Sequence, residues 1–540
     1  MRASAPGDDV IDLVCAGCGH RVPDETAFVT RCPEAVDGDD VDHVLRRVIV
    51  PGTIAFPLAQ LPPAEPPPAE LPRAEPPAKV IPTGYGPPGD SPFEPDPFVR
   101  FRRLFRGYHV ARAAGWSDER YVGLVRRLDG AIAGVDGRGP HETPFAPADE
   151  LGERLGFVAP GGVWVKDETG NVSGSHKARH LVGLMLELLV AEEVARERGS
   201  AGRPVPTDGL PSSPGAPAPA PALAPGVAPR ASAAAPRLAI ASCGNAALAA
   251  AVVARAANRA LDVFVPTWAD AAVVARLQDL GATVIACPRL PGEVGDPAYH
   301  RLRAAIAAGA IPFTCQGTES GLAIEGGQTL GYEIASRLVA TGRRLDAIVV
   351  QVGGGALASA VAAALAEARA LGALDREPRL YAVQAAGCAP LERAWSRLLE
   401  RAAAEGLDAA LAHAARHRSS YMRPWDAEPA SAAHGILDDE TYDWFAVAEA
   451  MARTGGRAVV VDEATILEAN RLARAMTRID ADHTGTAGLA GLLELLRRGD
   501  VRPDESVAVL FTGVRRVDER GDAPGFGPGA TSRHKERSAR

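Results

Sequence analysis

A single lysine, Lys177, lies among small hydrogen-bonding residues in the stretch GNVSGSHKARH at 170–180. The stretch follows the apolar-to-acidic run VWVKDET at 163–169, so it has the pattern of a turn between a strand and a helix. A lysine amine can condense with a carbonyl group when a partly desolvated site keeps some of it neutral. The setting therefore predicts a lysine that performs covalent chemistry.

Three consecutive glycines follow another apolar run, in VQVGGGALASAV at 350–361. Backbone amides left open by the missing side chains, together with the positive end of the following helix, can hold an anion. A tight turn that packs a strand against a helix would also need glycine. The stretch has neither the lysine of a nucleotide P-loop nor the spaced glycines of a dinucleotide site, so the expected anion is a small phosphate.

Two further strand ends carry polar residues. In ASCGNAALAAAV at 241–252, Ser242, Gly244 and Asn245 lead into a helix and could cap it, or their amides could bind a substrate carboxylate. In VAVLFTGVRR at 507–516, Thr512 would direct its hydroxyl into the same crevice, although a threonine there is also an ordinary strand residue. Asp482 and Thr484 precede another helix and have the pattern of N-caps.

Short β-branched runs that end at glycine or polar turns alternate with alanine-rich helical segments along most of the chain. The predicted strands are 238–242, 262–266, 283–287, 347–352, 380–384 and 507–513, and the clearest predicted helices are 246–258 and 356–371. Strand, turn and helix in repetition predict an α/β fold with parallel sheets. Ligands of such folds bind beyond the carboxyl ends of the strands, which is where all of these polar residues fall.

Composition excludes several classes of protein. The chain of 540 residues is 46% hydrophobic, carries a formal net charge of −9 and has no long basic run, so no nucleic-acid partner is expected. Seven scattered cysteines indicate reduced thiols, and neither an export signal nor a membrane-spanning run is visible. These features predict a soluble cytoplasmic enzyme that does not bind membranes.

The chain divides by composition into segments. We expect a cysteine knuckle at 1–50, a proline-rich linker at 51–97, a catalytic region at 98–515 and a disordered tail at 516–540. Within the catalytic region, an Ala-, Pro-, Gly- and Ser-rich insertion at 199–236 is expected to be disordered. In 98–134, apolar residues recur at helical spacing, with a break at Gly115 and a new helix start at Ser117.

The ordered set of a lysine in a Ser/Gly turn, SxGN, three glycines and a terminal Thr-Gly resembles the pyridoxal-phosphate enzymes of fold type II. This superfamily includes threonine synthase, the serine and threonine dehydratases, cysteine synthase and the tryptophan synthase β subunit. The resemblance covers roughly 140–515, and IEGGQTLGYEI at 324–334 is similar to another family stretch. It implies two parallel-sheet α/β domains with the active site between them, the smaller one at about 178–310, and pyridoxal 5′-phosphate as cofactor.

The resemblance also implies a role for each residue. Lys177 would hold the cofactor as a Schiff base and then move the α-proton of a small amino-acid substrate. Asn245 would contact the ring hydroxyl, and Thr512 would lie beside the pyridine nitrogen, where a neutral hydroxyl favours elimination and replacement over transamination. The residues expected to bind the cofactor phosphate are Gly353, Gly354, Gly355, Ala356 and Leu357, with His176 beside them. Those expected to bind the substrate carboxylate are Ser173, Gly174, Ser242 and Gly244.

The chain departs in places from the motifs of the individual subfamilies. Threonine synthases and dehydratases commonly follow the lysine with Asp-Arg, whereas Lys177 precedes Ala178-Arg179. The loop SCGN and the strand end FTG look most like threonine synthase, so a β- or γ-elimination or replacement of that kind is the first expectation. A serine/threonine-type ammonia-lyase is the second, and a non-catalytic ligand sensor on the same fold is the rival from another class. The resemblance is also consistent with a homodimer, to which the 98–134 helices could contribute.

The N-terminal cysteines resemble the zinc-ribbon-like knuckle found in many threonine synthases. Cys15, Cys18 and Cys32 supply three thiols, but Ala35 stands where a fourth is expected. A closed zinc site needs four ligands, so either His20 or His43 completes it, or the knuckle keeps its shape without metal.

The segment 416–444 is the richest in polar and aromatic residues, and no standard role follows from the resemblance. ILDDET has the acidic first turn of a helix, and the segment could otherwise form a lid or a substrate pocket. A phosphorylated substrate would require cations near Lys177, for which Arg418 and Arg423 are the candidates.

Overall fold

The computed structural model describes residues 11–23, 28–36, 38–50, 52–58, 94–200, 235–293 and 295–516. The predicted insertion at 199–236 and the tail after 516 therefore lie almost wholly outside the described residues. Most of the predicted linker at 51–97 does as well. Within that linker, Phe56 is described and is buried against Phe101 and Tyr332 of the catalytic region, with ring centroids 6.2 and 5.8 Å away. Among the described residues no helix combines the length and apolar character needed to cross a bilayer.

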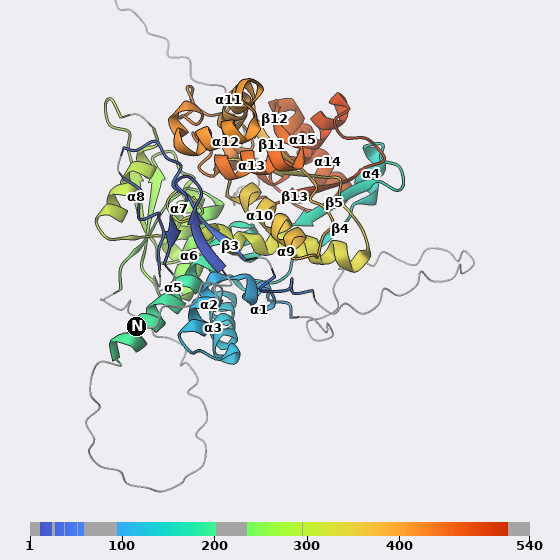
Figure 1. Ribbon diagram of the computed structural model, residues 1–540. Coiled ribbons are helices and arrows are strands. Elements are labelled where there is room, and N and C mark those ends of the chain that lie inside the picture. Colours follow the sequence, from blue (N-terminus) through green and yellow to red (C-terminus); the bar gives the residue numbers. More distant parts are fainter. Residues whose placement is uncertain are drawn as a thin grey trace, which may run out of the picture.

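Two α/β units form the catalytic region, as the alternation of strands and helices predicts (Figure 1). The larger sheet has the order β12-β11-β10-β13-β5-β4 and is parallel except for β4. Its strands are β4 (Phe145–Pro147), β5 (Gly162–Asp167), β10 (Ala347–Gln351), β11 (Arg379–Ala385), β12 (Arg457–Val461) and β13 (Ser506–Phe511). The smaller parallel sheet has the order β8-β7-β6-β9. Its strands are β6 (Leu238–Ala241), β7 (Leu261–Pro266), β8 (Thr283–Cys287) and β9 (Ile311–Pro312).

Helices cover both sheets because their alanine-rich faces pack closely on the β-branched strands. They are α1 (Pro97–Arg100), α2 (Arg106–Ala113), α3 (Asp118–Asp136), α4 (Asp149–Arg154), α5 (Lys177–Ser200), α6 (Asn245–Ala256), α7 (Ala271–Asp279), α8 (Pro297–Ala307), α9 (Ala323–Thr341), α10 (Ala356–Ala370), α11 (Pro390–Glu405), α12 (Leu407–Arg416), α13 (Trp444–Thr454), α14 (Glu463–Thr477) and α15 (His483–Arg498). Ser117 caps α3 and Asp482 caps α15, as the sequence predicts. The fold is that of two parallel-sheet α/β units with a small N-terminal cysteine unit.

The glycine pair of IEGGQTLGYEI explains how α5 is held. A Cβ atom at Gly326 would meet the backbone of Arg179 and Gly183, and one at Gly327 would overlap the ring of His180. Helices α5 and α9 therefore cross at backbone contact distance, which only glycine permits at these positions. This crossing fixes the helix whose first residue is Lys177.

The N-terminal unit is a three-stranded antiparallel sheet of β1 (Ile11–Cys15), β2 (Arg21–Val22) and β3 (Leu45–Ile49). In Figure 1 strand β3 lies next to α9 of the catalytic region. The buried Arg47 of β3 donates to Gln328 and Tyr332 of α9 and pairs with Glu367 of α10 at 2.7 Å. The unit is thus attached to the catalytic region by buried charge pairs.

Candidate active site

The turn before α5 places Lys177 beside the end of β13. Ser173 and Gly174 have left-handed φ angles of 54° and 70°. Ser175 pairs with Gly513, and the backbone N–H of His176 donates to the carbonyl of Thr512 at 3.2 Å. Lys177 is only partly buried and begins the helix. A non-glycine residue held at positive φ is costly and is common at functional sites, which suits the position of Ser173 in the predicted carboxylate loop.

The triglycine stretch connects β10 to α10. Gly355 has φ 96° and stands at the N-cap of α10 without a side-chain cap. The first amides of a helix have no acceptor within it, so those of Ala356 and Leu357 are available to an external anion. The structure therefore brings the predicted phosphate cradle to the carboxyl end of a central strand.

Thr512 has a defined hydrogen-bonding role. The Gln351 amide nitrogen donates to the Thr512 hydroxyl oxygen at 2.7 Å and to the Gly485 carbonyl at 2.9 Å. Because the hydroxyl accepts from Gln351, its own proton is free to be donated elsewhere. Gln351 was not predicted from the sequence as a site residue, although it precedes the predicted cradle by only two positions.

The smaller unit meets the larger one at Asn245. Arg516 donates to the Asn245 side-chain oxygen at 2.9 Å and to the Ser173 carbonyl at 2.7 Å. The Ser242 hydroxyl accepts from the Gly244 amide at 3.4 Å, and helix α6 has no side-chain cap. One guanidinium thereby joins the predicted carboxylate turn at Ser173 to Asn245, the residue that follows the second predicted carboxylate loop. Arg516 was not predicted as a site residue, because the tail was expected to begin at 516; the available signal was the arginine pair that closely follows Thr512-Gly513.

His176 is buried and neutral. Burial lowers its pKa well below the usual value, and the nearby charges of Lys177 and His180 act in the same direction. Its Nδ1 atom lies 3.3 Å from the Thr512 carbonyl, and Nε2 has no partner among the described residues. Phosphate binding by His176 stays a prediction.

The segment 436–443 lies directly on the triglycine stretch. The Thr441 hydroxyl donates to the Gly353 carbonyl and the Asp443 amide donates to the Gly354 carbonyl, both at 2.9 Å. The expectation that ILDDET begins a helix is wrong, because helix α13 begins at Trp444 and only a single 3-10 turn covers His434–Ile436. The segment instead supplies side-chain and backbone donors to the glycine carbonyls.

Arg418 is not available to a phosphorylated substrate. It pairs with Asp42 of the N-terminal unit at 2.6 Å and with Glu440 at 2.8 Å. Arg423 is exposed, and its carbonyl accepts a hydrogen bond from Arg393. Arg418 thus links the N-terminal unit to the segment above the glycines.

A buried ion network lies on α5 and β5. Arg179 binds Glu168 at 2.8 Å and Glu333 at 2.6 Å, and Lys166 also pairs with Glu333. Burial alone would raise the pKa of Glu168, but Arg179 and Lys166 lower it to about 2. Arg179, which follows the departure at Ala178 and is itself the arginine of the family pattern, therefore positions the start of α5.

A cluster of possible metal ligands lies in the N-terminal unit. Ligand atoms of Cys15, Cys18, Cys32 and His43 all fall within 4.8 Å of one another. The sulfur atoms of Cys18 and Cys32 are 3.7 Å apart, and Nδ1 of His43 is 3.4 Å from the sulfur of Cys15. Of the two histidines left open by the sequence, the structure selects His43.

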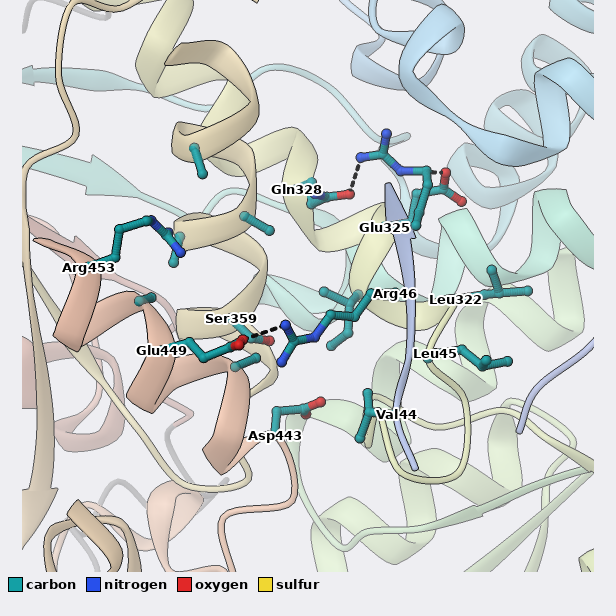
Figure 2. A pocket seen from close by; sticks show the side chains of 18 residues that line it. Val44, Leu45, Arg46, Leu322, Glu325, Gln328, Ser359, Asp443, Glu449 and Arg453 are labelled. Carbon is teal, nitrogen blue, oxygen red and sulfur yellow. Dashed lines mark hydrogen bonds and ion pairs between the residues drawn. The ribbon is translucent and has the colours of Figure 1, made fainter. Parts of the chain in front are cut away.

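A separate pocket of about 140 Å³ lies between the N-terminal unit and helices α9, α10 and α13 (Figure 2). Arg46 and Glu449 pair across it, and Arg453 and Ser359 also line it. Of the described residues that line it, none is a predicted cofactor or substrate residue. Asp443 lines this pocket while its backbone amide binds the triglycine stretch, so the pocket lies behind the candidate site.

The residues around Lys177 fit pyridoxal phosphate. They supply an amine, an uncapped helix start behind a glycine turn, and a hydroxyl with a free proton. Lys177 lies beside the end of β13, and the other two groups follow β13 and its neighbour β10 in the same sheet.

Comparisons with known proteins found relatives by sequence and by structure. Two threonine synthases, from Methanocaldococcus jannaschii and Methanosarcina acetivorans, are each 25% identical over 190 residues, which are 35% of this chain and 41% of the relative's length. Among solved structures, maize serine racemase is similar with a TM-score of 0.49 and 17% identity over 73% of this chain and 93% of that one. The processed form of threonine deaminase isoform 2 from Solanum lycopersicum has a TM-score of 0.48 and 16% identity over 74% and 91% of the two chains.

The family of pyridoxal-phosphate dependent enzymes matches residues 138–513. This range is more than half of the chain and contains every predicted cofactor and substrate residue. The chain therefore belongs to the pyridoxal-phosphate dependent enzymes, with the two-unit architecture of fold type II.

Proposed function

We propose that the chain catalyses a β- or γ-elimination or replacement on a small amino acid, with pyridoxal phosphate held through Lys177. The observation that carries this proposal is the Thr512 hydroxyl, which accepts from Gln351 and keeps its own proton to donate. A neutral hydroxyl beside the ring nitrogen leaves that nitrogen unprotonated, which favours elimination and replacement over transamination. The cofactor supplies an electron sink for charge that develops at the substrate Cα.

The residues of the chain would then act on the substrate directly. The Ser173–Gly174 turn and the Ser242–Gly244 loop would bind the α-carboxylate, and Arg516 would add positive charge between them. Because the Asn245 oxygen is occupied by Arg516, its NH₂ group is left to donate to the ring oxygen. Lys177 would remove the α-proton and return it to the product.

Within this class, the geometry favours an ammonia-lyase acting on serine or threonine. Arg418, the expected phosphate ligand, is paired with two carboxylates. Burial raises the pKa of Asp438 and that of Asp439, and the nearby carboxylate of Asp296 raises both further, whereas Lys177 acts to lower that of Asp438. These carboxylates would repel the phosphate group of a phosphorylated substrate side chain.

Threonine-synthase-like replacement on a phosphorylated substrate is the second candidate. The sequence similarity to two threonine synthases favours it. The test is to incubate the purified, cofactor-loaded chain with serine, threonine, O-phosphohomoserine and O-acetylserine and to measure 2-oxo acid, ammonia and phosphate. We expect 2-oxo acid from serine or threonine. Phosphate release together with threonine from O-phosphohomoserine alone would select the second candidate, and a colourless, inert protein would favour the ligand sensor.

A structural zinc ion in the N-terminal unit is a separate proposal. In a tetrahedral zinc site with thiolates, neighbouring sulfur atoms are about 3.8 Å apart, close to the spacing of Cys18 and Cys32. Nε2 of His43 lies 3.1 Å from the Asp39 carboxylate, an arrangement that orients a metal-binding imidazole. The four residues therefore match a closed Cys₃His site.

We expect the purified chain to carry one zinc ion, measured by elemental analysis. His43→Ala should weaken zinc binding by more than about 100-fold, because it removes a direct ligand rather than an outer partner. His20→Ala is the matched control, since His20 instead pairs with Glu34 at 3.4 Å, and it should retain the metal. Equal zinc content in the native chain and His43→Ala would exclude this ligand set.

A further inference from the structure

The carboxylate of Asp438 lies in the triglycine cradle. A Cβ atom at Gly353 would overlap the Asp438 Oδ2 atom, and one at Gly354 would lie 3.7 Å from it. The backbone N–H of Gly354 also interacts with the carboxylate and acts to lower its pKa. An acidic side chain therefore uses one of the amides expected to bind the cofactor phosphate.

Neighbouring contacts hold Asp438 in this place. Thr441 and Asp443, three and five residues after Asp438, donate to the carbonyls of Gly353 and Gly354, so the segment that carries Asp438 is anchored to the same glycine turn. The Cys388 thiol donates to the Asp438 carbonyl at 3.3 Å. Asp438 is thus positioned by the fold on the glycine turn, next to α10.

The charges around Asp438 do not neutralise it fully. Its pKa is raised to about 6, mainly by burial and also by Asp296 and Asp439, whereas Lys177 and the Gly354 amide act in the opposite direction. Near neutral pH the group is then largely ionised. A carboxylate on the Gly354 amide and an incoming phosphate carry charge of the same sign, and they require the same donor.

We propose that Asp438 competes with the cofactor phosphate for the triglycine cradle and so limits the affinity of the chain for phosphorylated pyridoxal. Loading requires the carboxylate to leave the Gly354 amide or to take up a proton. The amides of Gly355, Ala356 and Leu357 remain for the phosphate. The inference concerns cofactor affinity, and it holds whichever of the two proposed reactions the enzyme catalyses.

The experiment compares pyridoxal phosphate with pyridoxal, which lacks the phosphate. The full-length chain is stripped of cofactor with hydroxylamine, and dissociation constants for both compounds are measured by absorbance and tryptophan fluorescence. We expect Asp438→Asn to tighten pyridoxal phosphate binding by about tenfold, since it removes one like charge at the phosphate site, and to change pyridoxal binding by about twofold or less. Inorganic phosphate should also compete more strongly with the cofactor in this variant.

Asp439→Asn is the matched control because it removes the adjacent carboxylate without touching the glycine turn. It should change the ratio of the two dissociation constants by about twofold or less. Asp438→Ser serves as a second neutral variant, and circular dichroism checks that each variant folds. An unchanged ratio in folded Asp438→Asn and Asp438→Ser overturns the proposal, as does weaker binding of pyridoxal phosphate, which would mean that Asp438 donates a proton to the phosphate. Absence of phosphate binding in all variants also overturns it. Failure to find a substrate leaves these binding results unaffected, so the two proposals fail separately.

Discussion

Replacing Lys177 with alanine is expected to lower kcat/KM by at least about 1000-fold, because one amine both holds the cofactor and moves the α-proton. The visible absorption that borohydride bleaches should disappear with it. The lysines of the chain number four, at 79, 166, 177 and 535. Lys166 is fully buried in contact with Glu333 and Thr143. Mass spectrometry of the borohydride-reduced native protein should therefore place the cofactor on the peptide that contains Lys177.

Lys177→Arg is the matched control for charge. It keeps the cation near Asp438 but cannot form the covalent link, so it should lose activity to the same extent as Lys177→Ala. Both variants should unfold near the native midpoint, because Lys177 is only partly buried and belongs to none of the hydrogen bonds that hold the turn among the described residues. Label on another lysine, or a reducible link that survives in Lys177→Ala, would contradict the assignment.

The strands and the convergence of the site could be predicted because both depend on local pattern. Short β-branched runs ending at glycine, such as AIVVQ before the triglycine, became strands β10 and its neighbours. Carboxyl ends of parallel strands gather at one edge of a sheet, so polar residues that follow different strands meet there. Gln351, two residues before the triglycine stretch, makes such a contact by donating a hydrogen bond to Thr512 on the neighbouring strand end.

The position of Asp438 could not be predicted, because no regular element fixes it. Acidic residues at ILDDET match a helix start. The free energy of that preference is smaller than that of the tertiary contacts made by Thr441 and Asp443, so the contacts determine the conformation. Likewise, spacing alone allowed either His20 or His43 as a fourth ligand. The pairing of β1 with β3 decides for His43 by bringing Cys15 opposite Leu45. A local sequence pattern cannot predict long-range contacts of this kind.

Neutralising Glu333 should cause the largest loss of stability among single isosteric changes in this region. Glu333 is 1% exposed and is shared by Arg179 and Lys166. Glu333→Gln would leave two buried cations facing only Glu168, and breaking a buried charge pair in this way costs about 3–5 kcal/mol. Denaturant unfolding followed by circular dichroism measures the change, and Glu333→Gln should also be more sensitive to temperature than the native chain.

A second substitution distinguishes charge imbalance from lost packing. Lys166→Met added to Glu333→Gln restores a balance of one cation to one anion, so the double variant should recover part of the loss, whereas additive losses would contradict the charge argument. Asp375→Asn, in an exposed pair with Arg344, should change stability by about 1 kcal/mol or less.

The pKa of Glu168 is lowered to about 2, so the stability that its carboxylate contributes is complete at any pH above the ordinary pKa of a glutamate. That contribution is lost only as the pH falls toward 2. Glu168 should therefore still pair with Arg179 in mildly acidic buffer.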